Sequence, residues 1–324
     1  MTFLIIQTAF IGDVILATAV VEKLSQKFPD VKIDFLLRKG NESLLENNPH
    51  ISEVIVWDKK QNKISNLFGI VKKVRSKKYT HVINLHRFAS SGIITGLSSA
   101  QHKIGFDKNP FSFLFTQKFE HNTNGRQHET LRNQNLISNL TDSIPAKPKL
   151  YPSDADIKAV ARFKNEKYSC IAPASVWFTK QFPKEKWVEV LNSFNSGSNV
   201  YLLGAASDNS ACEWIIENTS NKKITNLAGK LTFLESAALM KDAVMNYTND
   251  SAPLHIASAM NAPVRVVFCS TVPEFGFGPL SDDSKIIQTK EKLDCRPCGL
   301  HGFAVCPKGH FECALLIDIK EFAL

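Results

Sequence analysis

Turn and helix-cap residues stand between two apolar runs near position 250. Asp250 and Ser251 are residues that cap helices, and Pro253 suits the first turn of the helix expected at 254–260. A helix that begins in this way leaves its first backbone N–H groups free to bind a phosphate or a diphosphate. His255 lies in that first turn and could donate to the same anion. The alternative is an ordinary capped helix of an α/β protein with a structural histidine.

Gly12 and Asp13 follow the first apolar run, at the start of a helix expected at 14–28. This place is the carboxyl end of the first strand, where open parallel sheets bind their ligands. Asp13 could therefore act on a ligand, or it could only cap the helix. The turn holds one glycine, whereas the fingerprint G-x-G-x-x-G of dinucleotide-binding proteins needs three, so a dehydrogenase is disfavoured.

A third candidate site is the loop at 173–183, PASVWFTKQFP, which follows a strand expected at 168–172. Its Ser175 offers a hydroxyl donor and its Lys180 a positive charge, and both residue types bind phosphate oxygens. A single lysine in a loop is more often only solvated. Asp208 follows the strand expected at 200–204, where a carboxylate can bind the hydroxyl groups of a ribose.

Four cysteines gather near the end of the chain, within 19 residues: Cys295, Cys298, Cys306 and Cys313. The first two have the spacing of a zinc knuckle, so the group could hold a structural zinc ion. His301 or His310 could replace one of the thiols. The alternatives are reduced thiols without a metal, or disulfides within the tail.

The elements that would position these residues alternate along both halves of the chain. Apolar runs predict strands at 3–6, 32–37, 54–57, 81–85, 103–106, 168–172, 200–204, 243–247 and 264–268. Helical spacing predicts helices at 14–28 and 64–74, one that starts at 42–47, and another from 186. Such alternation is typical of parallel α/β sheets. The proline-rich stretch PAKPKLYP at 145–152 predicts a boundary at 150, which gives domains at 1–150 and 151–324.

Composition and charge narrow the class of protein. The 324 residues, 44% hydrophobic and 22% charged, suit two globular domains. Residues 1–150 hold 21 Lys and Arg against 12 Asp and Glu, a net charge of +9, which suits an acidic acceptor, an anionic membrane surface, nucleic acid or simple solubility. The basic helix at 64–74 is the part that suits a membrane surface. No apolar run approaches the roughly 20 residues that cross a bilayer, and no signal peptide is recognised, so we expect a cytoplasmic protein.

Several of these stretches resemble one known family. The runs TNDSAPLHIASAMNAPV at 248–264 and TAFIGDVILATAVVEKL at 8–24 are similar to the donor-binding and opening motifs of glycosyltransferase family 9, the ADP-heptose:lipopolysaccharide heptosyltransferase family. The loop at 173–183 and the segment NLAGKLT at 226–232 resemble two further motifs of that family. Two positions depart from its pattern: Ala252 stands where the family has glycine, and Ala19 where it has proline.

The resemblance implies the GT-B fold, in which two Rossmann-like domains face each other across a cleft. It assigns acceptor binding to the first domain and nucleotide-sugar binding to the second. Asp13 would be the general base, and Gly12, His86, Arg87 and Arg126 are candidate acceptor contacts. The candidate donor contacts are Ser175, Lys180, Asp208, Gly229, Leu231, Asp250, Ser251, Ala252 and His255.

The implied reaction is an inverting transfer of a heptose or a related sugar from an ADP-sugar to lipopolysaccharide core or a similar envelope glycan. Catalysis would need no cofactor, and the only metal expected is the structural zinc of the tail. The expected partners are the ADP-sugar, an acidic glycolipid acceptor and the inner face of the cytoplasmic membrane, and nucleic acid is not one of them. Two alternatives stay open: a GT-B epimerase that binds a nucleotide sugar, and a non-catalytic protein that binds envelope glycans.

Overall fold

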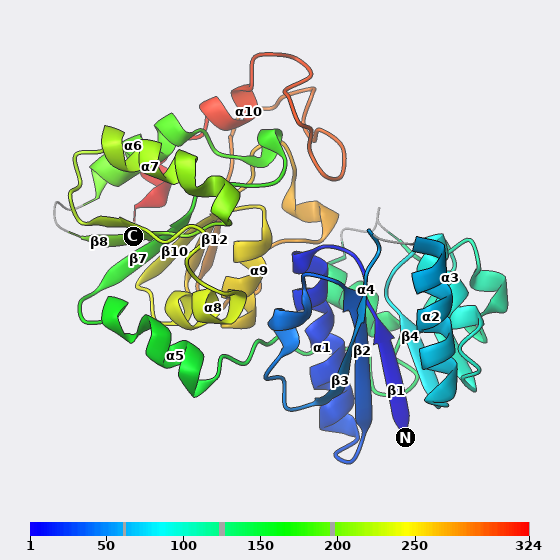
Figure 1. Cartoon of the computed structure of the whole chain (residues 1–324). Helices are drawn as coiled ribbons and strands as arrows, with labels where there is room; N and C mark the ends of the chain where they lie inside the picture. The colour runs from blue at the N-terminus through cyan, green and yellow to red at the C-terminus, as the bar shows by residue number, and fades with distance from the viewer. Residues whose placement is uncertain (61–62, 123–126, 195–197, 324) are drawn as a thin grey trace. The chain divides into compact units, whose positions relative to one another are not determined.

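The computed structural model describes residues 1–60, 63–122, 127–194 and 198–323. The chain divides into two compact units, Met1–Tyr151 and Pro152–Leu324, which Figure 1 shows in blue to green and in green to red. Each unit is an α/β layer structure around one parallel sheet. Within the described residues, no helix is long and apolar enough to cross a membrane.

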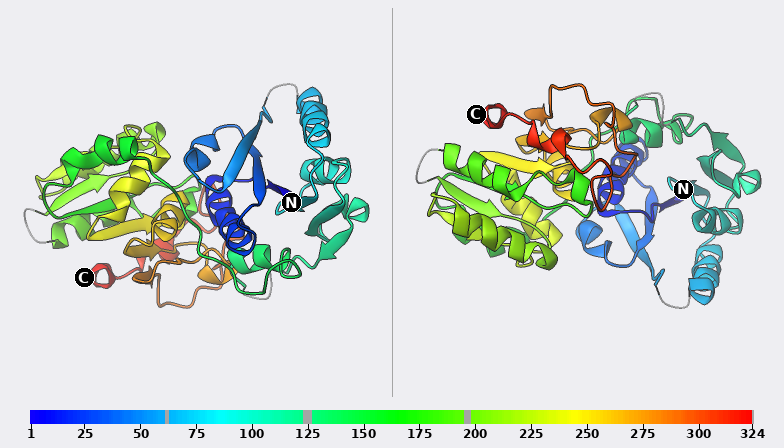
Figure 2. Two further views of the ribbon diagram at one scale, coloured as in Figure 1. Left: turned by 90° about the horizontal axis from the view of Figure 1, so that it is seen from below. Right: turned by 90° about the horizontal axis from the view of Figure 1, so that it is seen from above.

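The first unit contains a six-stranded sheet in the order β3-β2-β1-β4-β5-β6, and every strand pair in it is parallel. Its strands are β1 (Thr2–Ile6), β2 (Lys32–Arg38), β3 (Ile51–Trp57), β4 (His81–Asn84), β5 (His102–Phe106) and β6 (Gln117–Phe119). Its helices are α1 (Ile11–Lys27), α2 (Lys63–Ser76), α3 (Ala89–Gly96) and α4 (Glu129–Asn135). α1 packs with α4 and α2 with α3, and the sheet lies between these two pairs (Figure 2).

The second unit repeats this strand order as β9-β8-β7-β10-β11-β12, again with parallel pairing. Its strands are β7 (Tyr168–Ala172), β8 (Asn199–Leu202), β9 (Ile224–Asn226), β10 (Met245–Asn249), β11 (Val264–Val267) and β12 (Ser284–Ile287). Its α-helices are α5 (Asp154–Val160), α6 (Lys184–Ser193), α7 (Asn209–Asn218), α8 (Phe233–Lys241), α9 (Ala252–Ala259) and α10 (Glu312–Leu315).

The central strands are apolar on both faces because helices cover both sides of each sheet. Residues Phe3 to Ile6 of β1 are completely buried. Each such side chain contributes roughly 1.5 to 3 kcal/mol relative to an exposed one. Trp57 in the first unit and Trp187 in the second are also almost fully buried, so each unit has its own core.

Each sheet reverses its strand order once, between β1 and β4 in the first unit and between β7 and β10 in the second. Ligands of open parallel sheets bind beyond the carboxyl ends of the strands at such a reversal. Gly12 and Asp13 follow β1, and His86 follows β4. Lys180 follows β7, and Asp250 follows β10. The fold therefore brings the sequence candidates to the reversal point of each sheet.

Some predicted bounds were wrong. The first helix begins at Ile11 instead of 14, so Asp13 is its third residue. The strand predicted at 243–247 runs to Asn249 because β7 and β11 pair with it on both sides as far as Thr248 and Asn249. The predicted helix near 42–47 is one turn of 3-10 helix, Glu42–Leu45.

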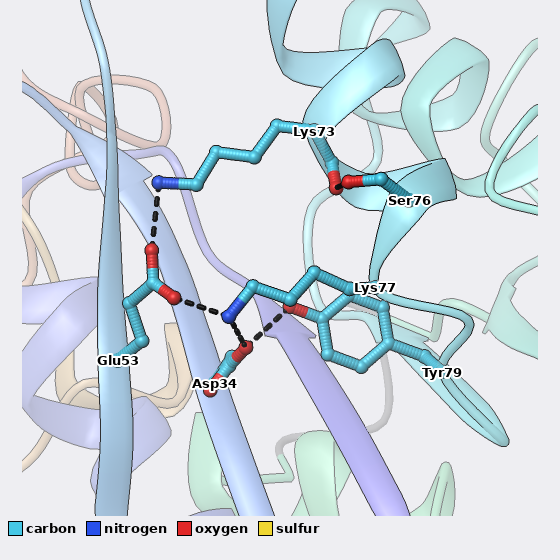
Figure 3. Close-up of polar contacts among 6 residues, drawn as sticks. All are labelled: Asp34, Glu53, Lys73, Ser76, Lys77 and Tyr79. Carbon is cyan, nitrogen blue, oxygen red and sulfur yellow. Dashed lines mark hydrogen bonds and ion pairs between the residues drawn. The ribbon is translucent and has the colours of Figure 1, made fainter.

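Charged side chains form a network near the amino-terminal ends of β2 and β3 (Figure 3). Asp34 accepts a hydrogen bond of 2.5 Å from the Tyr79 hydroxyl, and the Lys77 ammonium lies 3.3 Å from the same oxygen. Lys77 also pairs with Glu53, which Lys73 contacts at 2.7 Å. These contacts hold α2 and the turn after it against the sheet, at the end of the strands opposite to Asp13.

Candidate active site

Asp13 lies in the first turn of α1, directly after the loop that follows β1. One of its carboxylate oxygens accepts a hydrogen bond of 3.1 Å from the backbone N–H of Phe10. Burial raises the pKa of Asp13 to about 7, and the nearby carboxylate of Glu129 adds to the rise, while the Phe10 N–H and Arg38 oppose it. A carboxylate with a pKa near neutrality is suited to accept a proton from a substrate.

Glu129 stands at the first position of α4 and is itself bound in an ion pair. The Arg132 guanidinium donates to one Glu129 oxygen from two nitrogens, at 2.9 and 2.6 Å. Both side chains are buried. Glu129 is therefore engaged in structure, whereas no ion pair of Asp13 is found within the described part of the chain.

His86, predicted to contact the acceptor, is buried beyond the end of β4. Its Nδ1 lies 3.3 Å from the Thr8 hydroxyl, and the Lys59 ammonium donates to the same hydroxyl at 2.8 Å. Burial, followed by the charges of Lys59 and Arg87, lowers the pKa of His86 to about 3. His86 is therefore neutral at physiological pH and can take part in hydrogen bonds without carrying charge.

Thr8 and Lys59 were missed by the sequence reasoning. Each follows a strand end, Thr8 after β1 and Lys59 after β3, which is the only signal that could have selected them. Their contact depends on the order of the strands in the sheet, which brings segments 51 residues apart together.

Of the other acceptor candidates, Gly12 is the second residue of α1, and Arg87 stacks over the ring of Phe88 at 5.4 Å. Arg38 stacks in the same way over Phe10, at 4.8 Å. The rings of Phe10 and Phe88 are both exposed, so each arginine and its ring present a flat cationic surface. Arg126 lies outside the described residues.

Among the candidate donor contacts, the structure joins two residues directly. The Lys180 ammonium lies 2.7 Å from a carboxylate oxygen of Asp250, and the Thr271 hydroxyl donates to the same oxygen at 2.6 Å. Asp250 and Thr271 are buried and Lys180 is half-buried. Thr271, which the sequence reasoning missed, follows β11, so three strand ends contribute to this cluster.

Asn249 fixes the loop after β7 to the end of β10. Its side-chain oxygen accepts from the Phe182 N–H at 2.9 Å, and its amide nitrogen donates to the Pro173 carbonyl at 2.7 Å. The segment between Pro173 and Phe182 carries Ser175 and Lys180. Ser175 is half-buried, and its backbone carbonyl accepts from Gln181 at 2.6 Å.

The helix predicted to bind the anion is α9, whose N-cap is Ser251. Ser251 is extended, with φ −155° and ψ −179°, and its side chain makes no capping hydrogen bond. Ala252 is the first helical residue, so its backbone does not need the positive φ that favours glycine. Alanine at position 252, where the resembling family has glycine, is therefore compatible with the backbone. His255 is buried, with its ring edge-on to Phe277 at 6.2 Å.

Asp208, Gly229 and Leu231 lie around the ends of β8 and β9. A carboxylate oxygen of Asp208 accepts from the Ala205 N–H at 2.8 Å, which closes the turn after β8. Gly229 has φ +72°, and an added Cβ would lie 2.7 Å from Cα of Ala206, so only glycine fits there. Leu231 is half-buried. The contacts of Asp208 and Gly229 are those of a structural turn, and their ligand role stays a prediction.

The four cysteines of the tail are free thiols in this structure. Cys298 donates to the Cys295 carbonyl at 3.1 Å, and the Cys295 sulfur lies 3.8 Å from Nε2 of His310. Burial raises the pKa of the Cys313 thiol to about 12. Within the described ranges, no three His, Cys, Asp or Glu side chains are placed to hold a metal ion. The zinc site therefore gains no support from these positions and stays a prediction.

Known proteins are similar to this chain over most of its length. The model of glycosyltransferase family 9 (heptosyltransferase) matches residues 67–300. Lipopolysaccharide heptosyltransferase 3 of Escherichia coli is 31% identical to this chain over 281 residues, 81% of this chain and 82% of that protein.

Solved structures agree with this match. A family 9 glycosyltransferase from Veillonella parvula DSM 2008 has a TM-score of 0.80 at 23% identity and covers 88% of this chain and 85% of its own. The E. coli ADP-heptose LPS heptosyltransferase II has a TM-score of 0.76 at 21% identity over 100% of both chains. With two six-stranded parallel sheets, these neighbours confirm the predicted GT-B fold. The loops that carry Lys180 and Asp250 lie inside the matched residues, and the chain belongs to glycosyltransferase family 9 and is a glycosyltransferase.

Proposed function

We propose that the chain transfers a heptose from an ADP-sugar to a hydroxyl group of lipopolysaccharide core, with inversion at the anomeric carbon and without a catalytic metal. The names of two similar proteins support the sugar, donor and acceptor: a lipopolysaccharide heptosyltransferase at 31% identity, and an ADP-heptose LPS heptosyltransferase with the same fold. In this proposal the unit 1–151 binds the acceptor and the unit 152–324 binds the donor.

One observation carries the chemistry: the carboxylate of Asp13, at the carboxyl end of β1, has its pKa raised to about 7. The acceptor oxygen would attack the anomeric carbon while Asp13 takes the hydroxyl proton. The bond between that carbon and the diphosphate oxygen breaks in the same displacement, so the new bond forms on the opposite face. The electron pair of the broken bond leaves with ADP.

The leaving diphosphate needs positive charge where its own charge increases. Lys180 and the first N–H groups of α9 are the candidates, because an ammonium and a helix start both stabilise phosphate oxygens. The Lys180 ammonium lies on Asp250 at 2.7 Å, and a bound diphosphate would share that cation. No metal takes part in any of these steps.

The expected partners follow from charge. The +9 net charge of residues 1–150 suits an acidic glycolipid at the inner face of the cytoplasmic membrane. We do not expect nucleic acid as a partner. The zinc predicted for the four tail cysteines is separate from catalysis, and metal analysis of the purified protein tests it.

The decisive experiment incubates the protein with ADP-heptose and lipopolysaccharide cores truncated at successive heptose positions, with and without EDTA. We expect a product heavier by one heptose, with the anomeric configuration opposite to that of the donor and a yield that EDTA does not change. A retained configuration, or a yield that EDTA abolishes and a divalent metal restores, would overturn the proposed mechanism. If ADP-heptose gives no transfer to any of the cores while other nucleotide sugars are used, the proposed donor and acceptor are wrong.

A further inference from the structure

The segment Arg296–Phe303, here called the tail segment, lies on two loops of the second unit. It belongs to the orange and red end of the chain in Figure 1 and follows β12. The Arg296 guanidinium donates to the backbone carbonyls of Cys269 at 2.7 Å, Phe268 at 3.2 Å and Thr271 at 2.9 Å. It also donates to the side chain of Gln288 at 2.7 Å. One side chain thus fixes the course of the loop after β11.

A second link joins the tail segment to the same loop. The backbone N–H of Cys298 donates to the Ser270 carbonyl at 2.8 Å. The Ser270 hydroxyl in turn donates to the Thr179 hydroxyl at 3.1 Å, in the loop that follows β7. The two loops are therefore connected to each other as well as to the tail.

The far end of the tail segment binds the loop after β7 directly. The Thr179 N–H donates to the Phe303 carbonyl at 3.1 Å, and the Phe303 N–H donates to the Thr179 hydroxyl at 2.8 Å. At the neighbouring Gly302, with φ +77°, an added Cβ would lie 2.9 Å from the Thr179 hydroxyl oxygen and 3.0 Å from Cγ of Lys180. The tail backbone therefore leaves no room for a side chain between Gly302 and Lys180.

These contacts converge on one cluster. The loop after β7 carries Lys180, the loop after β11 carries Thr271, and both side chains bind the same oxygen of Asp250. We propose that the tail segment is a positioning element of the donor site, which holds Lys180 and Thr271 in place around Asp250. This inference rests on the proposed role of Lys180 in binding the donor diphosphate.

Two glycines of the tail form a matched pair for the test. Gly302 and Gly309 have nearly equal φ values of +77° and +75°, so alanine brings the same backbone strain at both. An added Cβ at Gly302 meets Thr179 and Lys180, whereas an added Cβ at Gly309 meets nothing within 4 Å. Gly302→Ala therefore adds contacts with the two loops that the tail segment binds, closest with Thr179 and Lys180 and at 3.4 Å with the Ser270 hydroxyl oxygen.

The experiment measures ADP binding by calorimetry for the full-length wild type, Gly302→Ala, Gly309→Ala and Lys180→Ala. It also measures hydrogen exchange of the backbone at 174–182 without ligand. We expect Gly302→Ala to weaken ADP binding at least tenfold and to speed exchange in that segment, while Gly309→Ala stays within twofold of wild type in both. Arg296→Lys, which keeps the charge but loses the forked guanidinium, is a second variant and should also weaken ADP binding.

The outcomes separate this inference from the proposed function. If Lys180→Ala weakens ADP binding but Gly302→Ala and Arg296→Lys bind as wild type does, the positioning role is wrong and the donor site stands. Equal losses in Gly302→Ala and Gly309→Ala would assign the effect to backbone strain and also overturn it. If the wild type does not bind ADP, the donor assignment fails. Hydrogen exchange at 174–182 that is the same in Gly302→Ala as in the wild type would then overturn the contact role of the tail as well.

Discussion

The two ends of the first sheet use the same side chain in opposite ways. Near the amino-terminal ends of the strands, the Asp34 carboxylate is bound by the Tyr79 hydroxyl at 2.5 Å and by Lys77 at 3.3 Å (Figure 3). At the carboxyl end of β1, the Asp13 carboxylate accepts from the Phe10 N–H, and burial together with the neighbouring Glu129 carboxylate raises its pKa to about 7. A bound carboxylate stabilises structure, and a carboxylate whose charge is disfavoured is available to take a proton.

The cluster of Asp250, Lys180 and Thr271 in the second unit lies between these two cases. Asp250 is bound by Lys180 and Thr271, as Asp34 is bound in its network, but Lys180 and Thr271 lie on loops at the carboxyl ends of the strands, where Asp13 also lies. We infer that this pair exchanges partners when a diphosphate binds. Four substitutions test this comparison.

The largest effect is expected from Asp13→Asn, which keeps the shape of the side chain and removes the base. Transfer should fall by roughly 10² or more, the usual span for loss of a general base, while nucleotide binding is kept. Transfer rates with a saturating donor measure this.

The same substitution has an effect on stability that depends on pH. Because the folded state holds the Asp13 proton up to about pH 7, the stability that this proton provides is lost as pH rises from about 4 to 7. Asp13→Asn should therefore not lower the stability at pH 8, and a lower melting temperature there would identify Asp13 as a helix cap.

Lys180→Ala should have the next largest effect, and it should change the affinity for the donor. Loss of a charge-assisted contact is expected to weaken ADP-sugar binding by about 1.5 to 3 kcal/mol. Lys186→Ala is a suitable control, because Lys186 is a lysine of the same unit that pairs with Glu189. Equal affinities of the Lys180→Ala variant and the wild type for ADP and for the ADP-sugar would exclude Lys180 from the site.

Tyr79→Phe tests the structural end of the comparison. It removes the hydroxyl that donates to Asp34, so the free energy of unfolding should fall by about 1.5 to 3 kcal/mol. Denaturant unfolding measures the change, and ADP binding should stay as in the wild type. A variant as stable as the wild type would show that Lys77 alone satisfies the Asp34 carboxylate.

The fourth substitution, His81→Phe, changes only the acid sensitivity of the fold, in a ring stack at the amino-terminal ends of β1, β4 and β5. The His81 ring stacks on Phe3 at 4.6 Å and on His102 at 4.5 Å. Burial, and then His102, lowers the pKa of His81 to about 4, so stability should fall as pH drops below about 6.5 towards 4. Between pH 7.5 and 5, the wild type should lose about 2 kcal/mol more than His81→Phe. Identical acid sensitivity in denaturant unfolding of both proteins would contradict this assignment.

The sequence was sufficient to predict the two α/β halves and the loops that carry the candidates. Short apolar strands and cap residues such as Ser251 are local signals, and they placed Asp13, Lys180 and Asp250 at strand ends. The helix α3 was missed because Ala89–Gly96 is rich in serine and glycine, which are typical of loops. The strand β6 has three residues at the sheet edge, too few for a clear period.

The site contacts that were missed are those made between distant segments. Thr271 meets Asp250 because β10 and β11 are neighbours in the sheet, and Lys59 meets Thr8 across 51 residues. The contact of Gly302 with Lys180 depends on the course of the tail, for which no periodic pattern exists. Spacing along the sequence does not contain these distances, so only the folded chain can supply them.

The role of Asp13 as the general base is tested most directly by the pH dependence of kcat/KM for transfer, measured for the wild type and Asp13→Asn between pH 5.5 and 8.5. Because Asp13 acts as a base only when it is ionised, the wild-type value should fall about tenfold for each pH unit below about 7. Asp13→Asn should show a low rate without that acid limb. A wild-type rate that stays constant across this range, with Asp13→Asn within a few-fold of it, would contradict the assignment of Asp13 as the general base.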